Sequence, residues 1–197
     1  MTGFTLVEIL VVIGILSILA AVLAPVLTAA KLSAKKTTSL SNLSQMGRAF
    51  LLYAVDADDR VAHGIPLTWD KFRYAVPDDL LVIALTAPVV EPLVRPYGLT
   101  PGILQAPNDP GFDEFHPTPS YFEAYGTSYG LRRRATLEAI PLTHYDEPSN
   151  EPFAWEIGRY YDRVDDPKMA KVNVLFFDFS TRYVTRVFLF NAMSGQE

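Results

Sequence analysis

Hydrophobic residues are concentrated near the N-terminus of the chain. The 22 residues from Ile9 to Ala30 include no charged side chain. As an α-helix this stretch would rise roughly 33 Å at about 1.5 Å per residue, enough to cross a bilayer core of about 30 Å. A buried core helix rarely needs apolar residues on every face, and a secretory signal would be shorter and preceded by basic residues. The pattern therefore predicts a membrane-spanning helix.

Beyond Lys31 the apolar positions change their period instead of ending. Five apolar side chains recur at intervals of three and four residues: Leu40, Leu43, Met46, Phe50 and Tyr53. This spacing predicts one stripe of an amphipathic helix that continues the membrane span. The acidic run Asp56–Asp59, followed by Gly64, predicts the helix end.

The remaining chain predicts short helices and a small sheet. The region from about Ile65 to Tyr145 is rich in Pro and Gly, with a helix-like stretch over Asp78–Ala87. The expected strands are Gly126–Gly130, Phe153–Ile157, Val172–Phe177 and Arg182–Phe188, the last two forming a hairpin. The expected fold class is α+β, with a long N-terminal helix packed on a small antiparallel sheet.

Composition and charge reduce the range of possible functions. The chain contains no Cys and therefore no disulfide. Its formal charge is -5, and because Glu8 is the only charged side chain before Lys31, the remainder carries -4. This balance argues against nucleic-acid binding. The one basic cluster, Arg132–Arg134, is interpreted as a solvated loop.

Residue patterns that carry catalysis are scarce. The sequence has no thiol, no nucleophile elbow, no phosphate-binding Gly loop and no metal-spaced pair among His63, His116 and His144. We therefore expect the protein not to be an enzyme.

Glu8 stands next to the apolar run, where an ionisable group is costly and often functional. If the bond after Gly3 were cut, the new α-amine of Phe4 would lie four residues from Glu8. Such an ammonium and carboxylate on neighbouring helices can pair in lipid when both charges are satisfied. The alternative is that Glu8 simply lies among lipid headgroups.

The segment Gly3–Leu10, Gly-Phe-Thr-Leu-Val-Glu-Ile-Leu, resembles the class III signal of type IV pilins and type II secretion pseudopilins. The resemblance implies that a membrane peptidase cuts after Gly3 and N-methylates Phe4, and that Glu8 guides the subunit into a helical filament. It also implies that Pro25 bends the helix, since Pro removes one backbone hydrogen bond and clashes with the preceding turn.

Two features depart from that family. Pilin leaders usually carry Lys or Arg before the Gly, whereas here Met1-Thr2 supplies only the terminal amine. Basic residues instead follow the span, at Lys31, Lys35 and Lys36, and a positive-inside count would place the large domain in the cytoplasm. We follow the motif, because long domains translocate largely regardless of flanking charge.

The rest of the chain also resembles a large group of bacterial pseudopilin-like proteins. The segments that carry this resemblance are Leu40–Gly47, Tyr53–Arg60, Ala106–Asp109 and Thr127–Gly130. In that group the last hairpin usually turns at Asp-Gly, with a His ten residues ahead. Here Phe179 follows Asp178, and Lys168 stands in place of the His. Roles of that His or Gly therefore do not transfer.

Two acidic clusters offer oxygen ligands to calcium: Asp56, Asp58 and Asp59, and Asp162, Asp165 and Asp166. Neither has EF-hand spacing, and helix termination and solvation explain both well. Because some pseudopilins bind calcium in a late loop, the resemblance favours Asp162, Asp165 and Asp166 as the candidate site. No other cofactor is expected.

Together these patterns divide the chain into a leader, residues 1–3, a membrane and filament-core helix, residues 4–30, and a periplasmic globular domain, residues 31–197. The resemblance implies a structural subunit of a type II secretion pseudopilus at the bacterial inner membrane. Its partners would be other filament subunits, the prepilin peptidase, and the assembly platform with its ATPase. The alternatives are a type IV pilin for adhesion, motility or DNA uptake, and a membrane-tethered binding module that never polymerises.

Overall fold

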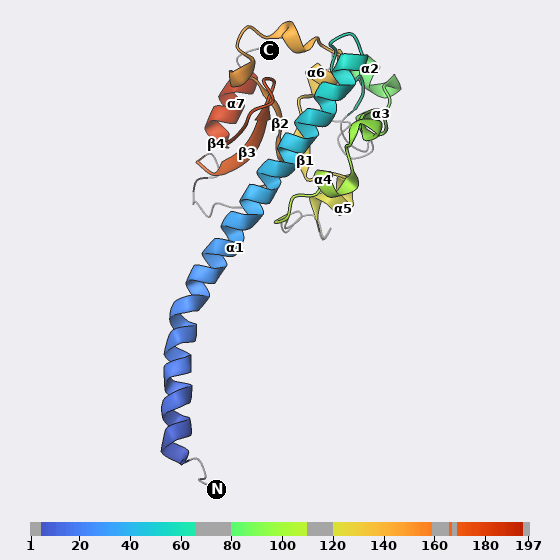
Figure 1. The fold of residues 1–197 in the computed structure, drawn as a ribbon. Coiled ribbons are helices and arrows are strands. Elements are labelled where there is room, and N and C mark those ends of the chain that lie inside the picture. The colour runs from blue at the N-terminus through green and yellow to red at the C-terminus, as the bar shows by residue number, and fades with distance from the viewer. Residues whose placement is uncertain (1–4, 66–79, 110–119, 159–165, 167–168, 195–197) are drawn as a thin grey trace.

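The computed structural model describes residues 5–65, 80–109, 120–158, 166 and 169–194. Its main element is helix α1, Leu6–Asp56, which runs for 51 residues. Figure 1 shows α1 as a spine, with the globular part of the protein gathered around its C-terminal end. The predicted long helix and its end at the acidic run are both confirmed.

Four strands form one antiparallel sheet beside the upper part of α1 (Figure 1). They are β1 (Tyr129–Leu131), β2 (Pro152–Glu156), β3 (Lys171–Phe176) and β4 (Thr181–Thr185), paired in that order. Leu43, Met46 and Phe50 of α1 share a hydrophobic cluster with Phe153 and Leu175 of the sheet. The α+β class with a small antiparallel sheet is therefore confirmed.

The prediction that the last strand continues to Phe188 is wrong. Strand β4 ends at Thr185, and Arg186–Ser194 form helix α7. Leu189 of α7 packs with Val172, Val174 and Phe176 of β3. Because side chains alternate along a strand, this face is opposite the one that Leu175 turns to α1. The C-terminal apolar residues thus fold as a helix that covers the second face of the sheet.

Eight short helical segments complete the described fold. They are α2 (Leu81–Thr86), α3 (Val90–Val94), η4 (Arg95–Tyr97), α4 (Pro101–Leu104), α5 (Tyr121–Tyr125), α6 (Arg133–Leu137), η5 (Leu142–His144) and η6 (Pro148–Asn150). The helix expected over Asp78–Ala87 is present as α2, and residues 78 and 79 lie outside the described residues. The strand expected from Gly126 begins only at Tyr129, because Gly126 ends α5 in the left-handed conformation, with φ of 76°.

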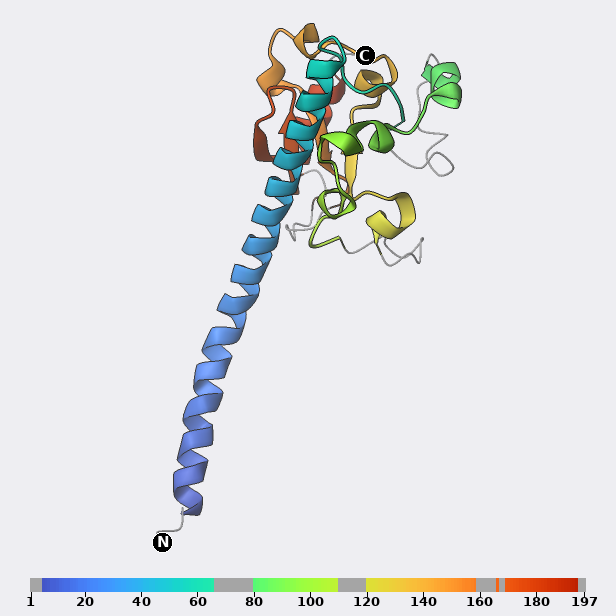
Figure 2. The same cartoon turned by 45° about the vertical axis from the view of Figure 1, so that its right-hand side comes forward.

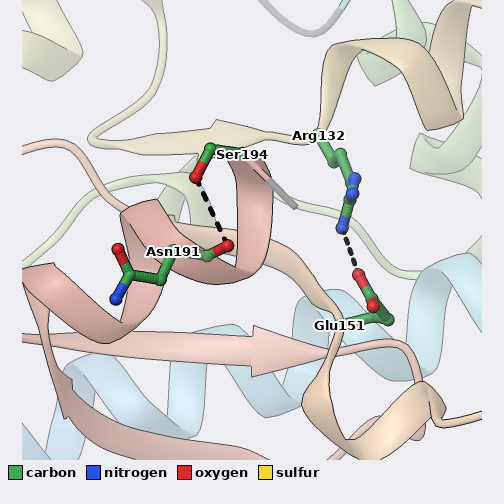
Figure 3. A network of polar contacts seen from close by, with 4 residues as sticks. All are labelled: Arg132, Glu151, Asn191 and Ser194. Carbon is green, nitrogen blue, oxygen red and sulfur yellow. Dashed lines mark hydrogen bonds and ion pairs between the residues drawn. The ribbon is translucent and has the colours of Figure 1, made fainter. Parts of the chain in front are cut away.

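The Arg132–Arg134 cluster is not a solvated loop, and this interpretation is corrected. Arg132 is 9% exposed, and Arg133 and Arg134 begin helix α6. The Nη1 atom of Arg132 donates to Oε2 of Glu151 at 2.7 Å (Figure 3). Burial lowers the pKa of the Arg133 guanidinium. Local sequence could not show this, because Glu151 comes from a segment 19 residues away.

The turn between β3 and β4 has an unusual conformation. Phe179 has a φ of 61°, in the left-handed region that is costly for a residue with a Cβ atom. Its ring lies against α1 where the helix comes close to the sheet, since a Cβ atom added at Gly47 would lie 3.2 Å from Cδ1 of Phe179. The ring contact of Phe179 therefore accompanies backbone strain at this turn.

We expect Phe179→Gly to be more stable than Phe179→Ala by about 1 kcal/mol. Both variants lose the ring contact with α1, but only Gly relieves the strain of the positive φ. Thermal or denaturant unfolding of the full chain in detergent measures the difference. Equal stabilities would show that the left-handed conformation carries no cost at this turn.

Candidate functional site

The N-terminal turn of α1 places Glu8 next to Thr5 in a capping box. Oε2 of Glu8 accepts from the backbone N–H of Thr5 at 2.8 Å and from its hydroxyl at 2.6 Å. The backbone N–H of Glu8 donates to Oγ1 of Thr5 at 3.3 Å. The predicted processing residues Gly3 and Phe4 lie outside the described residues. Glu8 is thus hydrogen-bonded to Thr5, the residue that directly follows Phe4.

The lower part of α1 is exposed on every side. Residues from Leu6 to Ala30 are all exposed, and the helix is long and apolar enough to cross a membrane. The run Ile9–Ala30 carries two hydroxyls, and both donate within the helix. Ser17 donates to the Ile13 carbonyl at 2.7 Å, and Thr28 to the Ala24 carbonyl at 2.9 Å. The run therefore offers an apolar surface with its side-chain hydroxyls satisfied.

Pro25 lies inside this helix, as predicted for the bend. It lacks the N–H that would donate to the carbonyl of Ala21. Figures 1 and 2 both show that the lower and upper parts of α1 run in different directions. The proline and the change of direction together fit a helix that bends between its lipid half and its protein half.

Comparison with known proteins identifies the N-terminal segment. The family model of the prokaryotic N-terminal methylation motif matches residues 2–24. No curated protein and no solved structure matches the chain. The match and the fold are consistent with a type IV pilin- or pseudopilin-like protein.

Two of the segments behind the second resemblance meet in space. The hydroxyl of Ser128 donates to Oδ2 of Asp109 at 2.6 Å and accepts from the N–H of Ala106 at 3.0 Å. The same region is tied to α1, because Lys35 donates to Oδ1 of Asn108 at 2.9 Å. These hydrogen bonds hold the start of β1 and the loop after α4 together and tie that loop to α1.

The structure does not test the calcium prediction. Asp162 and Asp165 lie outside the described residues. The backbone carbonyl of Asp166 accepts from the N–H of Met169 at 3.0 Å. Across the part of the chain that is described, no three His, Asp or Glu side chains are grouped so that they could hold a metal ion. Calcium binding at Asp162, Asp165 and Asp166 stays a prediction.

A buried polar cluster between α1 and the sheet was not predicted. Its centre is Glu156 of β2, whose side chain is 1% exposed. Ser39 of α1 donates to Oε1 of this carboxylate. Asn173 of β3 donates to it twice, from its backbone N–H at 3.1 Å and from Nδ2 at 3.3 Å. The hydroxyl of Tyr129 of β1 lies 2.9 Å from that of Ser39.

This cluster joins α1 to three strands. Burial raises the pKa of the Tyr129 phenol, so the hydroxyl keeps its proton and can donate to Ser39. Nδ2 of Asn173 is also 3.3 Å from the carbonyl of Lys36, a second link to α1. A sequence signal existed, because Glu156 is an acidic residue at the end of the apolar strand β2. Its partners, however, are up to 117 residues away.

We expect Thr5→Ala to loosen the first turn of α1, because the capping box is lost. Such a cap contributes about 0.5–2 kcal/mol. Amide hydrogen exchange at Glu8 and Ile9 should therefore be several-fold faster than in the parent chain. Thr5→Ser keeps the hydroxyl and should exchange as slowly as the parent. Equal exchange in the two variants would rule out a contribution from the cap.

We expect Ser39→Ala to destabilise the chain by about 1–3 kcal/mol, because the buried carboxylate loses a donor. The control Ser41→Ala removes an exposed hydroxyl two residues away and should change stability by less than about 0.5 kcal/mol. A double-mutant cycle of Ser39→Ala with Glu156→Gln, measured by denaturant unfolding, should give a coupling energy of about 0.5–3 kcal/mol. Additive effects would show that the two side chains do not interact.

Proposed function

We propose that this protein is a structural subunit of a type II secretion pseudopilus. The observation that carries the proposal is the N-terminal methylation motif, which matches residues 2–24 and runs into an apolar helix without buried contacts. The motif supports a type IV pilin-family protein. The choice of a pseudopilus within that family is supported by the resemblance of the segments joined at Asp109 and Ser128.

In this function the protein is the substrate of a processing enzyme and catalyses no reaction itself. A prepilin peptidase would cut between Gly3 and Phe4 and methylate the new amine. The chain would wait in the bacterial inner membrane, with residues 31–197 in the periplasm, until the assembly platform and its ATPase lift it into the filament. It would act without a catalytic site of its own and without nucleic acid.

The physical case for assembly rests on the lower half of α1. On leaving lipid, this surface must be covered by other apolar surface, and copies of the same helix supply it. The Glu8 carboxylate would then meet the free amine of Phe4 on a neighbouring subunit. Because a charge in an apolar core is tolerated only when paired, this contact would fix one axial register.

Two other functions remain candidates. A type IV pilin would use the same N-terminus, and long surface filaments containing the protein would favour it. A membrane-tethered binding module would use α1 only as an anchor, and then the charge of Glu8 would not matter for its activity.

We expect Glu8→Ala to remain in the membrane and to be lost from filaments, because the apolar span is kept while the docking charge is removed. The control Val7→Ala changes a neighbouring exposed side chain by a similar volume and should assemble as the parent does. Cysteine crosslinking between tagged copies measures assembly. Normal assembly of Glu8→Ala would overturn the docking role of Glu8, and a lack of crosslinks in the parent chain as well would favour a tether.

Mass spectrometry of the native N-terminus tests processing independently of assembly. It can be done on the same strains that are used for crosslinking. We expect a mature chain that begins with N-methylated Phe4. A chain that still begins at Met1 would contradict the processing step, whatever the filaments show.

A further inference from the structure

A cavity of about 270 Å³ lies in the globular part of the protein, beside α1. Its walls come from α1, α3, η4, α4, α5 and β1. Figures 1 and 2 show the short helices α3, α4 and α5 on one side of α1, with β3 and β4 on the other. The cavity is therefore separate from the sheet face that α7 covers and from the membrane half of α1.

Aromatic rings line much of this cavity. Phe50 comes from α1, Phe122 and Tyr125 from α5, and Tyr129 from β1. Met46 of α1 lies in the same wall. Aromatic rings favour edge-to-face and offset contacts with another ring, and a methionine sulfur adds a favourable contact with aromatic groups. The lining thus suits a flat aromatic guest.

Four residues of the cavity lining have polar groups that already pair within the protein: Glu91, Arg95, Thr127 and Tyr129. Nε of Arg95 is 2.8 Å from Oε1 of Glu91, so the two charges at the rim cancel. The hydroxyl of Thr127 accepts from the N–H of Tyr129 at 3.0 Å and donates to its carbonyl at 3.2 Å. The phenol of Tyr129 lies against Ser39. A charged guest would find no net countercharge in these groups, so the site favours a neutral one.

The cavity opens to solvent at its rim. The side chain of Arg95 is 63% exposed, and Val89 is 36% exposed. By contrast, Met46, Phe50 and Tyr129 are almost fully buried in the floor. A small molecule would therefore enter the cavity at the rim formed by Val89 and Arg95.

We propose that this cavity binds a small neutral aromatic molecule of about the size of indole. An apolar protein cavity of roughly 150 Å³ stays dry and takes up benzene; the larger volume here fits a two-ring guest. Binding replaces missing contacts along the apolar walls with dispersion contacts. The site would make the subunit a receptor for such molecules, and it does not depend on whether the protein forms filaments.

The test uses the full chain in lipid nanodiscs with ¹³C-labelled methionine methyl groups and indole as the probe. Indole bound in the cavity should shift the Met46 methyl resonance through its ring current, in a saturable way. Met169 and Met193 lie outside the cavity lining and report partitioning of indole into lipid. A nuclear Overhauser effect between indole protons and the Met46 methyl should appear in the parent chain, without any variant.

Two matched variants locate the binding. Val89→Trp should plug the rim and abolish the Met46 shift, since position 89 lines the cavity. Ile83→Trp alters a side chain of nearly equal exposure, 37%, in α2 outside the lining, and should bind indole as the parent does. The proposal fails if Met46 does not shift, if all methionine methyls shift alike, or if Val89→Trp binds as well as Ile83→Trp.

Discussion

Helix α1 has to suit two environments, an apolar one along its lower half and a protein core along its upper half. The rest of the structure follows from this constraint. The lower half of α1 has no protein contact, and its apolar surface suits lipid or other copies of itself. The upper half turns Leu43, Met46 and Phe50 into a protein core and leaves its outer face to solvent. Because both halves belong to one continuous helix, any shift of the upper half along the sheet also moves the lower half.

The buried cluster around Glu156 resists such a shift. Apolar packing alone tolerates sliding, because hydrophobic contacts are non-directional. The hydrogen bonds of Ser39 to Glu156 and of Asn173 to the Lys36 carbonyl are directional and buried. Between Glu8 and Ser39 the helix rises roughly 47 Å at about 1.5 Å per residue. The cluster thus sets how far below the globular domain the Glu8 carboxylate lies.

Sequence periodicity predicted the features that depend on local pattern. The extent of α1, the hairpin of β3 and β4, and strand β2 each follow from spacing that neighbouring residues define. It did not predict α7, since the apolar run at Val187–Phe190 suits a strand as well as a helix and only packing on β3 decides. The burial of Arg132 and Glu156 depends on partners distant in sequence. The cavity depends on six separate elements.

The capping box is compatible with the assembly role proposed above for the Glu8 carboxylate. Both bonds from Thr5 go to Oε2, and within the described residues Oε1 accepts no hydrogen bond. A carboxylate offers about four lone-pair sites, so an ammonium from a neighbouring chain could bind while the capping box stays intact. Thr5 would then hold the Glu8 side chain in one rotamer before the neighbour arrives. Part of the entropy lost in fixing the Glu8 side chain would then be lost before the neighbouring ammonium binds. This favours docking in a single register.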